Sequence, residues 1–382
     1  MTHLQTLLSL PLEQQIGQLL FIGLPGAELD DEARSLVEYV SPGGVIIFGR
    51  NVAAPTQLRD LLDGVRAMMK NVEPLFGIDQ EGGLVDRLRK ICTPMPAARV
   101  IRQHGDLAAA RAHGRITGEV LRLLGFNMNF APVMSIMTED RDLLSNGLYS
   151  RSFGRSPGEV LGYTMVYLRG LQGTGLLGCA KHFPGIGAGE VDSHQEMPII
   201  HLTHDDLMAQ DLAPYIELFQ REDNMVRAVM VSHGGFPNID IQKGTAGGKL
   251  VPASINHEIV TRLLREELAY TGLVVTDDLE MGAIARYCPI EEAALRAIQA
   301  GEDMLLICAR PDLIRRGYDS LLSAARSGEL PRERIEASLG RIAAFKALAN
   351  PPLPFDRKRF DELSSEVAEL NRKLNYVYGG KL

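Results

Sequence analysis

Eight short apolar segments recur along the chain, each bounded by turn-forming residues and mostly separated by stretches with helical character. Apolar residues within each segment are continuous rather than alternating, which is typical of strands buried on both faces of a parallel sheet. The pattern therefore predicts eight parallel strands. The segments are residues 19–23, 44–48, 74–78, 126–130, 176–180, 228–231, 273–276 and 303–307.

The intervening segments carry the signals of helix starts. Acidic residues 30–32 begin one segment with an apolar stripe, which suits the positive end of a helix dipole. Residues 56–69 place apolar side chains at helical spacing, Ser156-Pro157 has the order of a cap followed by a first helical residue, and Ser254 is expected to open another helix. Strands alternating with helices predict the α/β class, and eight strands favour a closed (β/α)8 barrel of the TIM type. A doubly wound open sheet is the main alternative.

The whole chain of 382 residues is predicted to form a single barrel domain, because barrels of this type reach this size without a second domain. The barrel core is expected at about residues 15–330, with extra C-terminal helices after it that pack against the outside of the barrel. The glycine-rich stretch 244–248 lacks the spacing of a phosphate-binding loop. It predicts a flexible connection near the barrel mouth.

Composition narrows the class of protein. Apolar residues make up 45% and charged residues 23% of the chain, as in an ordinary soluble globular protein. The formal net charge is −8 and no basic cluster is present, which argues against nucleic-acid partners and against an anionic membrane surface. No segment is apolar for long enough to span a bilayer, and the N-terminal segment does not resemble a signal peptide. The oligomeric state stays open, with a monomer as the simplest expectation.

The four cysteines, Cys92, Cys179, Cys288 and Cys308, are scattered along the chain without a CxxC pair. That spacing predicts reduced, mostly packing thiols rather than a disulfide or zinc framework. The cytoplasm is therefore the expected compartment, and no metal site is expected.

Polar and charged residues follow several of the predicted strands, and in a barrel the chemistry sits at the C-terminal strand ends. Any one of these groups could be structural: Asp278 could be a helix cap, and Arg151 could form a surface ion pair. Burying so many groups without partners would cost several kcal/mol each, so their recurrence indicates a shared site. The groups are Asp79-Gln80-Glu81, Arg151, Lys181-His182, Ser232-His233 and Asp277-Asp278.

Residues 181–198 combine a lysine, two histidines and an aspartate in one segment broken by glycine and proline. Asp192 and His194 stand two positions apart, so the carboxylate could fix the tautomer of the imidazole and raise its basicity for proton transfer near neutral pH. A structural loop with solvated polar residues is the alternative. A carboxylate on one side of a pocket and a proton donor on the other is the arrangement for glycosidic bond cleavage, with Asp277 as nucleophile and His194 as its partner.

Six motifs stand in order along the chain: GGVIIFGRN, IDQEGGLVDRL, NFAPV, RSFG, KHFPGIG with DSH downstream, and VVTDDLEM. Together they resemble the motifs of the glycoside hydrolase family 3 β-N-acetylglucosaminidases. They run from near the N-terminus to Met281 and cover most of the predicted barrel. The resemblance implies a single (β/α)8 barrel, a retaining double-displacement mechanism, and no metal or organic cofactor.

The resemblance also implies a role for each matching residue. Asp277 is implied as the nucleophile, and His194 as the general acid/base with Asp192 as its dyad partner. The implied substrate is a small carbohydrate, with terminal β-linked N-acetylglucosamine removed from peptidoglycan fragments in the bacterial cytoplasm. The implied sugar-binding residues are Asp79, Arg87, Arg151, Lys181 and His182.

Three positions depart from the family pattern. Leu84 stands where arginine is usual, Ser135 replaces an aspartate, and Ile186 replaces a second histidine. These changes leave open a weakly active or inactive sugar-binding protein on the same barrel. A β-glucosidase or xylosidase of the same family is a further alternative, although such enzymes usually take their acid/base from a second domain. Whether phosphate can replace water, and whether Glu190 or Glu196 could supply the proton instead of His194, also stay open.

Overall fold

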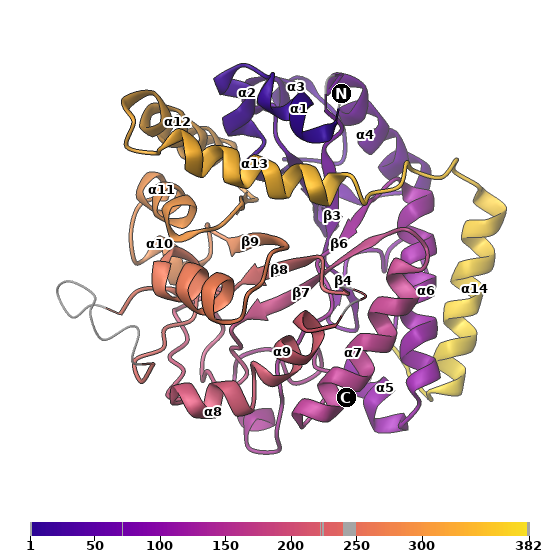
Figure 1. Ribbon diagram of the computed structural model, residues 1–382. Helices are drawn as coiled ribbons and strands as arrows, with labels where there is room; N and C mark the ends of the chain where they lie inside the picture. Colours follow the sequence, from indigo (N-terminus) through magenta and orange to yellow (C-terminus); the bar gives the residue numbers. More distant parts are fainter. Residues whose placement is uncertain (1, 71, 222, 224, 240–249, 380–382) are drawn as a thin grey trace.

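The computed structural model describes residues 2–70, 72–221, 223, 225–239 and 250–379. At its centre is an eight-stranded parallel sheet surrounded by helices (Figure 1). The predicted connection 244–248 lies outside the described residues. All eight predicted strands are confirmed, as β1 (Leu20–Gly23), β2 (Gly44–Ile47), β3 (Leu75–Ile78), β6 (Met128–Asn129), β7 (Leu177–Phe183), β8 (Ala228–Val231), β9 (Leu273–Asp278) and β10 (Met304–Ile307).

The sheet closes on itself. Neighbouring strands follow the order β3-β2-β1-β10-β9-β8-β7-β6. Between the first and last of these, the Phe130 N–H donates to the Ile78 carbonyl oxygen at 2.9 Å, and the Asn127 N–H donates to the Phe76 carbonyl oxygen at 3.3 Å. These bonds join β6 to β3. The (β/α)8 barrel is therefore confirmed, and the open doubly wound sheet is excluded.

Helices cover the outside of the barrel. Shorter elements lie in the N-terminal segment of the chain and in the loops. None of the helices in the described part of the chain is long and apolar enough to cross a membrane. In chain order the elements are α1 (His3–Leu8), α2 (Leu12–Gly17), α3 (Asp31–Val40), η1 (Gly49–Asn51), α4 (Pro55–Met68), β4 (Gln80–Gly82), β5 (Val85–Asp86), α5 (Ala98–His104), α6 (Leu107–Leu124), η2 (Arg141–Leu143), α7 (Pro157–Gln172), α8 (His204–Ala209), α9 (Ala213–Phe219), η4 (Ala253–Ile255), η5 (Glu258–Glu267), α10 (Gly282–Ala285), α11 (Ile290–Ala300), α12 (Pro311–Ser327), α13 (Arg332–Lys346) and α14 (Arg357–Lys373).

Two predicted helix starts are confirmed by their caps. The Asp30 carboxylate accepts a hydrogen bond from the Ala33 N–H at 2.9 Å at the start of α3. The Ser156 hydroxyl accepts from the Glu159 N–H at 3.3 Å at the start of α7. Each cap satisfies one of the backbone donors that a helix leaves free in its first turn.

The predicted helix start at Ser254 is wrong. Ser254 lies in the 3₁₀ turn η4, and its hydroxyl is 2.7 Å from Nδ1 of His233. The π-helical segment η5 begins only at Glu258, whose N–H donates to the side-chain oxygen of Asn256 at 3.0 Å. The Ser254 hydroxyl therefore pairs with His233, a residue distant in sequence, and the local sequence pattern could not predict this contact.

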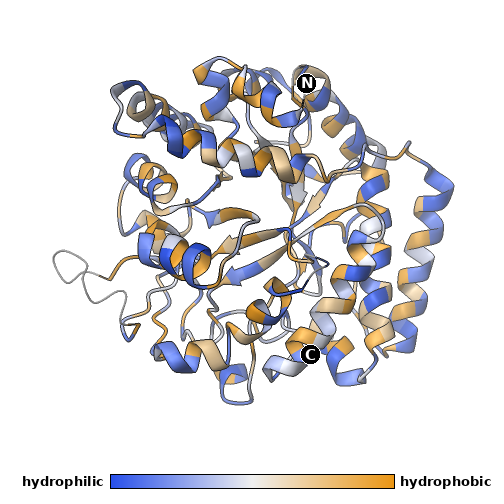
Figure 2. Ribbon diagram, viewed as in Figure 1, coloured by the Kyte–Doolittle hydropathy of each residue, from blue (hydrophilic) through white to orange (hydrophobic). Residues whose placement is uncertain are grey.

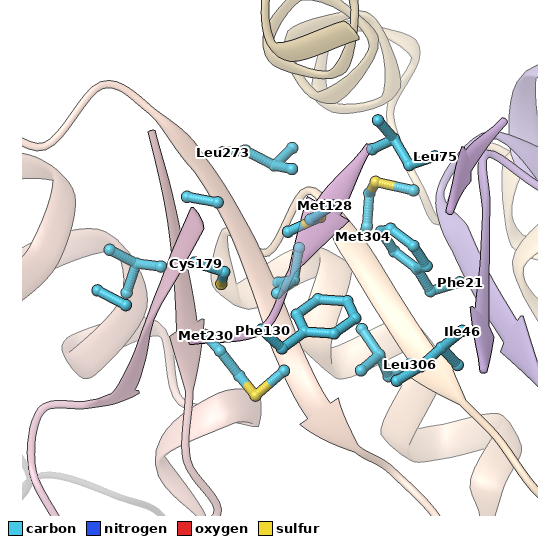
Figure 3. Close-up of a cluster of buried hydrophobic side chains, with 14 of the residues drawn as sticks. Phe21, Ile46, Leu75, Met128, Phe130, Cys179, Met230, Leu273, Met304 and Leu306 are labelled. Carbon is cyan, nitrogen blue, oxygen red and sulfur yellow. The ribbon is translucent and has the colours of Figure 1, made fainter. Parts of the chain in front are cut away.

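The barrel interior is filled by side chains from all eight strands (Figure 3). The rings of Phe21 and Phe130 meet edge to face, with centroids 5.4 Å apart. Two glycines make room for these rings. A Cβ at Gly44 would lie 2.2 Å from the Phe21 ring, and one at Gly77 would lie 2.5 Å from the Phe130 ring. Large residues thus face small ones across the interior, and the barrel is a packed core rather than a pore.

The two C-terminal helices pack against the outside of the barrel, as predicted. α13 contacts α1 and α2, and α14 lies along α6 (Figure 1). Arg359 of α14 pairs with Glu119 of α6 at 2.6 Å, and Arg115 pairs with Glu366. In Figure 2 the outer helices mix hydrophilic and hydrophobic residues, whereas the central strands are largely hydrophobic.

Two adjacent carboxyl groups precede β10 and differ sharply in their partners. Asp303 forms ion pairs with Arg265 at 2.6 Å and with Arg341 at 2.8 Å. Glu302 is fully buried, and neither of its carboxyl oxygens has a hydrogen-bond partner in the described part of the chain. Burial, with a smaller contribution from Asp303, raises the pKa of Glu302 well above its ordinary value. The fold therefore favours the protonated form of Glu302 more than the unfolded chain does.

Glu302→Gln is expected to stabilise the fold more as the pH rises. The unfolded chain loses this proton above its ordinary pKa of about 4.3, while the folded chain keeps it. The wild-type free energy of unfolding therefore falls by up to about 1.4 kcal/mol per pH unit until the folded pKa is reached, and the variant escapes this loss. Thermal unfolding from pH 4 to pH 8 measures the difference in Tm, with exposed Glu329→Gln as the control. A difference that stays constant with pH would contradict the assignment.

Candidate active site

Three polar side chains continue the inward faces of their strands at the C-terminal end of the barrel. Successive side chains of a strand point to opposite faces, so residues two or four apart share a face. Leu75, Cys179 and Leu273 point into the barrel interior (Figure 3). Two or four residues further along each chain segment, the side chain on the same face lies at the barrel mouth and is polar. The residues there are Asp79, Lys181 and Asp277.

Lys181 holds the first pair of carboxylates. Its ammonium nitrogen is 2.5 Å from Asp79 and 2.7 Å from Glu81. Only 2% of the side chain is exposed, and burial alone would lower the pKa of Lys181. The two carboxylates outweigh burial and raise that pKa, so the lysine stays charged. Arg87 lies at the edge of this group, 3.8 Å from Asp79.

Glu81 is the central anion of the cluster, and the sequence reading assigned it no role. Arg151 donates to both of its oxygens, at 2.8 and 2.9 Å, while Lys181 contacts it from another strand. Burial would raise the pKa of Glu81, but Arg151 and Lys181 together hold it well below its ordinary value. Its position after a predicted strand was a usable signal. Arg151 therefore belongs to a buried ion pair rather than to a surface one.

A tight hairpin of β4 and β5 places Glu81. Gln80 Nε2 donates to the Asp86 carboxylate at 2.8 Å, and the Met95 N–H donates to the same group at 2.7 Å. Gly82 adopts a φ of +90°, and a Cβ there would lie 2.4 Å from the Pro96 carbonyl oxygen. Only glycine fits this turn without strain. The hairpin thus fixes Glu81 between the strand ends.

Asp277 stands at the end of β9 as an ionised carboxylate. One oxygen accepts the Asp278 N–H at 2.8 Å, and the other lies 3.9 Å from Nε2 of His182. Burial would raise the pKa of Asp277, but the Asp278 N–H that donates to it and the charge of Lys181 favour the ionised form and hold the pKa below its ordinary value. Burial lowers the pKa of His182 to about 3, so this ring is neutral. His182 Nδ1 has no partner within the described residues.

The neighbouring Asp278 has a different environment. Burial raises its pKa to about 7, and its side chain accepts the Glu280 N–H at 3.1 Å. It caps a turn before α10 rather than the helix itself, whose N-cap is Met281. The Asp278 carbonyl oxygen accepts Nε2–H of His233 at 2.9 Å, so Nδ1 of that ring accepts the Ser254 hydroxyl. The two aspartates are therefore chemically distinct.

His194 and Asp192 lie on a separate loop after β7. Two peptide bonds in and directly after β7, Lys181–His182 and Phe183–Pro184, are cis. The Asp192 carboxylate is 2.8 Å from Nδ1 of His194 and also accepts its N–H at 2.9 Å. The imidazole is 70% exposed. The Asp192–His194 pairing predicted from the sequence thus forms, with Nε2 left free.

Backbone contacts dock this loop onto the segment that follows Asp277. The Gly282 N–H donates to the His194 carbonyl oxygen at 3.1 Å, and the Ala283 N–H donates to that of Ser193 at 3.3 Å. A Cβ at Gly282 would lie 2.3 Å from the Gln195 carbonyl oxygen. The loop carrying the dyad therefore rests on the start of α10, which follows the strand that carries Asp277.

The remaining named residues fall around this site. Leu84 is exposed at the tip of the hairpin, and Ile186 is buried. The Ser135 hydroxyl is buried without a hydrogen-bond partner in the described chain. Glu196 pairs with Arg286 at 3.0 Å on the surface. Within the described residues, no group of three or more His, Cys, Asp or Glu side chains could hold a metal ion.

The arrangement joins an ionised carboxylate, fixed cations and an imidazole with a free nitrogen at the mouth of a (β/α)8 barrel. That is the class of site found in enzymes that cleave glycosidic bonds. Residues 11–345 match the family model of the glycosyl hydrolase family 3 N-terminal domain, and the chain belongs to this family.

The chain is similar to several proteins of this family. It is 34% identical over 300 residues to a β-hexosaminidase of Bordetella avium. The matched region covers 76% of this chain and 81% of that protein. It is 30% identical over 339 residues to β-hexosaminidase A of Pseudoalteromonas piscicida, and spans only 55% of that protein's length. The structure of a family 3 β-N-acetylglucosaminidase from Paenibacillus sp. FPU-7 superposes with a TM-score of 0.84 at 35% identity, covering 95% of this chain and 69% of that one.

Gly282→Ala is expected to release the dyad loop without unfolding the barrel. The new methyl group would meet the Gln195 carbonyl oxygen, and the exposed loop can move away more easily than α10. Hydrogen–deuterium exchange should therefore become faster in residues 187–197, with little change in Tm. Gly162→Ala in α7 is the matched control, since a Cβ there meets open space. Unchanged exchange in the loop would show that the contact does not hold it.

Proposed function

We propose that the protein is a retaining exo-β-N-acetylglucosaminidase that hydrolyses terminal β-linked N-acetylglucosamine through a covalent glycosyl-enzyme intermediate. The observation that carries this proposal is the ionised Asp277 at the barrel mouth, close to fixed cations, with the Asp192–His194 dyad docked on the segment that follows it. A carboxylate nucleophile must be unprotonated at working pH, and the surroundings of Asp277 favour that state.

In the first step, Asp277 attacks the anomeric carbon of the sugar. A bond forms between the carboxylate oxygen and that carbon while the glycosidic carbon–oxygen bond breaks. The leaving oxygen takes a proton from Nε2 of His194, whose Nδ1–H is held by Asp192.

In the second step, His194 takes a proton from water as the water oxygen attacks the same carbon and displaces Asp277. Retention of the anomeric configuration follows from the two inversions. An imidazole suits both steps, because its ordinary pKa of about 6.5 is close to working pH.

The sugar is held by Asp79, Arg87, Arg151, Lys181 and His182 in this proposal. Charged donors and acceptors form strong hydrogen bonds to hydroxyl groups, and the unpartnered Nδ1 of His182 is free for one. Glu81 acts differently. Both of its oxygens are occupied by Arg151 and Lys181, so it positions these cations rather than contacting the substrate.

Two features favour N-acetylglucosamine over glucose or xylose as the sugar. The relatives from Bordetella avium and Paenibacillus carry the names β-hexosaminidase and β-N-acetylglucosaminidase. The dyad lies within the barrel chain itself, so no second domain is needed to supply the acid. We further infer peptidoglycan fragments as natural substrates and the cytoplasm as compartment, the latter because the four cysteines are scattered along the chain without a CxxC pair.

The test is a series of aryl β-N-acetylglucosaminides with leaving groups of graded pKa, with the aryl β-glucosides as counterparts. Wild type should cleave the N-acetylglucosaminides and spare the glucosides. His194→Ala should lose at least about 100-fold in kcat/KM for poor leaving groups, which need a proton, and much less for activated ones. Asp192→Ala should show the same trend more weakly, because it orients the ring.

Glucoside cleavage at the higher rate would move the protein to the β-glucosidases. No cleavage of any substrate would leave the sugar-binding alternative. A leaving-group dependence for His194→Ala that is parallel to wild type would mean that the proton comes from elsewhere, with Glu190 or Glu196 as the next candidates. Product analysis with and without phosphate separates hydrolysis from phosphorolysis in the same assay.

A further inference from the structure

A groove of about 610 Å³ lies between α6 and α7 on the outer wall of the barrel. Its position is remote from the candidate active site. Arg122 is in the last turn of α6, just before β6 begins, and so lies at the opposite end of the barrel from the C-terminal strand ends. The residues that line the groove are Ala108, Arg111, Ala112, Arg115, Glu119, Arg122, Arg169, Gly170, Gly173, Thr174 and Leu353.

The lining is strongly basic in an acidic protein. Four arginines and one glutamate face the groove, a formal charge of +3, whereas the whole chain carries −8. Arg115 is neutralised by Glu119 and by Glu366 of α14. The positive charge that remains comes from Arg111, Arg122 and Arg169.

Arg122 is the most unusual of these groups. Only 4% of it is exposed, and within the described residues its guanidinium makes one hydrogen bond, from Nη1 to the Asn350 carbonyl oxygen at 2.8 Å. Its Nε is buried without a hydrogen-bond partner in the part of the chain that the structure describes, and no described carboxylate forms an ion pair with it. Burial accordingly lowers the pKa of Arg122, with no anion acting against it. A buried charge without a counter-ion is unfavourable.

A comparison with Lys346 shows why a buried arginine keeps its charge where a buried lysine can lose it. It too is buried, in a separate cavity of about 440 Å³, and its amine donates only to the side-chain oxygen of Gln18 at 2.7 Å. Burial lowers the pKa of Lys346 to about 7, so the lysine can shed its charge. A guanidinium cannot lose its proton in a protein, so the charge of Arg122 persists.

The two other arginines leave their charge available at the rim. Arg111 is exposed and forms no ion pair with any described carboxylate, and Arg169 has only Asp223 at 3.8 Å. Between them the lining includes the small residues Ala112 and Gly170. A Cβ at Gly170 would lie 2.2 Å from the Arg111 carbonyl oxygen, so the close helix crossing requires this glycine. The volume is within the range of small-molecule sites.

The geometry points to an anion-binding site in this groove, which takes a small molecule bearing a phosphate or carboxylate group. Guanidinium groups bind both anions through paired hydrogen bonds. The bound anion supplies the counter-charge that Arg122 lacks, with Arg111 and Arg169 closing over it from the rim.

Calorimetric titration of the full chain with inorganic phosphate and with citrate, at constant ionic strength, tests this site. Binding of either probe to wild type is expected, with at least tenfold weaker binding in Arg111→Gln. Arg262→Gln, an exposed position on η5 outside the groove, removes the same charge and serves as the control, with binding unchanged. Cleavage of an aryl β-N-acetylglucosaminide should be the same in wild type, Arg111→Gln and Arg262→Gln.

Arg122→Met adds a second readout. Thermal unfolding of this variant should no longer respond to the probe, whereas the wild-type Tm rises with it. Phosphate binding alone identifies a phosphate site, and citrate binding alone identifies a carboxylate site. Absence of binding by both probes, or equal binding in wild type and Arg111→Gln, would overturn the proposal, even where Arg122→Met does not fold.

Discussion

The candidate site depends on one buried anion. Glu81 lies between Arg151 and Lys181, which come from segments far apart in the chain and meet only at the barrel mouth. Two cations at this depth would be costly without it, and a carboxylate at this depth would be costly without them. The charges therefore compensate one another. Their contacts hold three segments in one arrangement: the end of β7, the RSFG segment and the β4–β5 hairpin. The charge on Lys181 then helps to keep Asp277 ionised.

The barrel supplies the geometry on which this electrostatic arrangement rests. Alternation along β3, β7 and β9 sends apolar side chains into the packed interior and then, at the strand ends, Asp79, Lys181 and Asp277 into a common space. The dyad of Asp192 and His194 is placed in another way, by backbone hydrogen bonds to the segment after β9. Rigid strand ends thus carry the charged cluster, while an exposed loop carries the imidazole, as suits a group that must meet a leaving oxygen.

Much of the fold followed from the sequence, because continuous apolarity marks a buried parallel strand even where the strand is as short as β6. The residues of the strand ends could be collected for the same reason. Glu81 was collected with the other strand-end groups but given no role, because its two partners become neighbours only after the barrel closes. Ser254 was misread as a cap because its partner, His233, comes from a different strand end. The unpaired charge of Arg122 depends on the absence of a nearby carboxylate, which only a three-dimensional structure displays.

The central claim is that Asp277, rather than its neighbour Asp278, forms the covalent bond to the sugar. It is tested most directly by incubating wild type with a 5-fluoro glycosyl fluoride of N-acetylglucosamine, which slows release of the intermediate, and mapping the labelled residue by peptide mass spectrometry. The ionised state of Asp277 and the raised pKa of Asp278, about 7, predict a label on Asp277 alone. A label on Asp278, or on neither aspartate, would contradict the account.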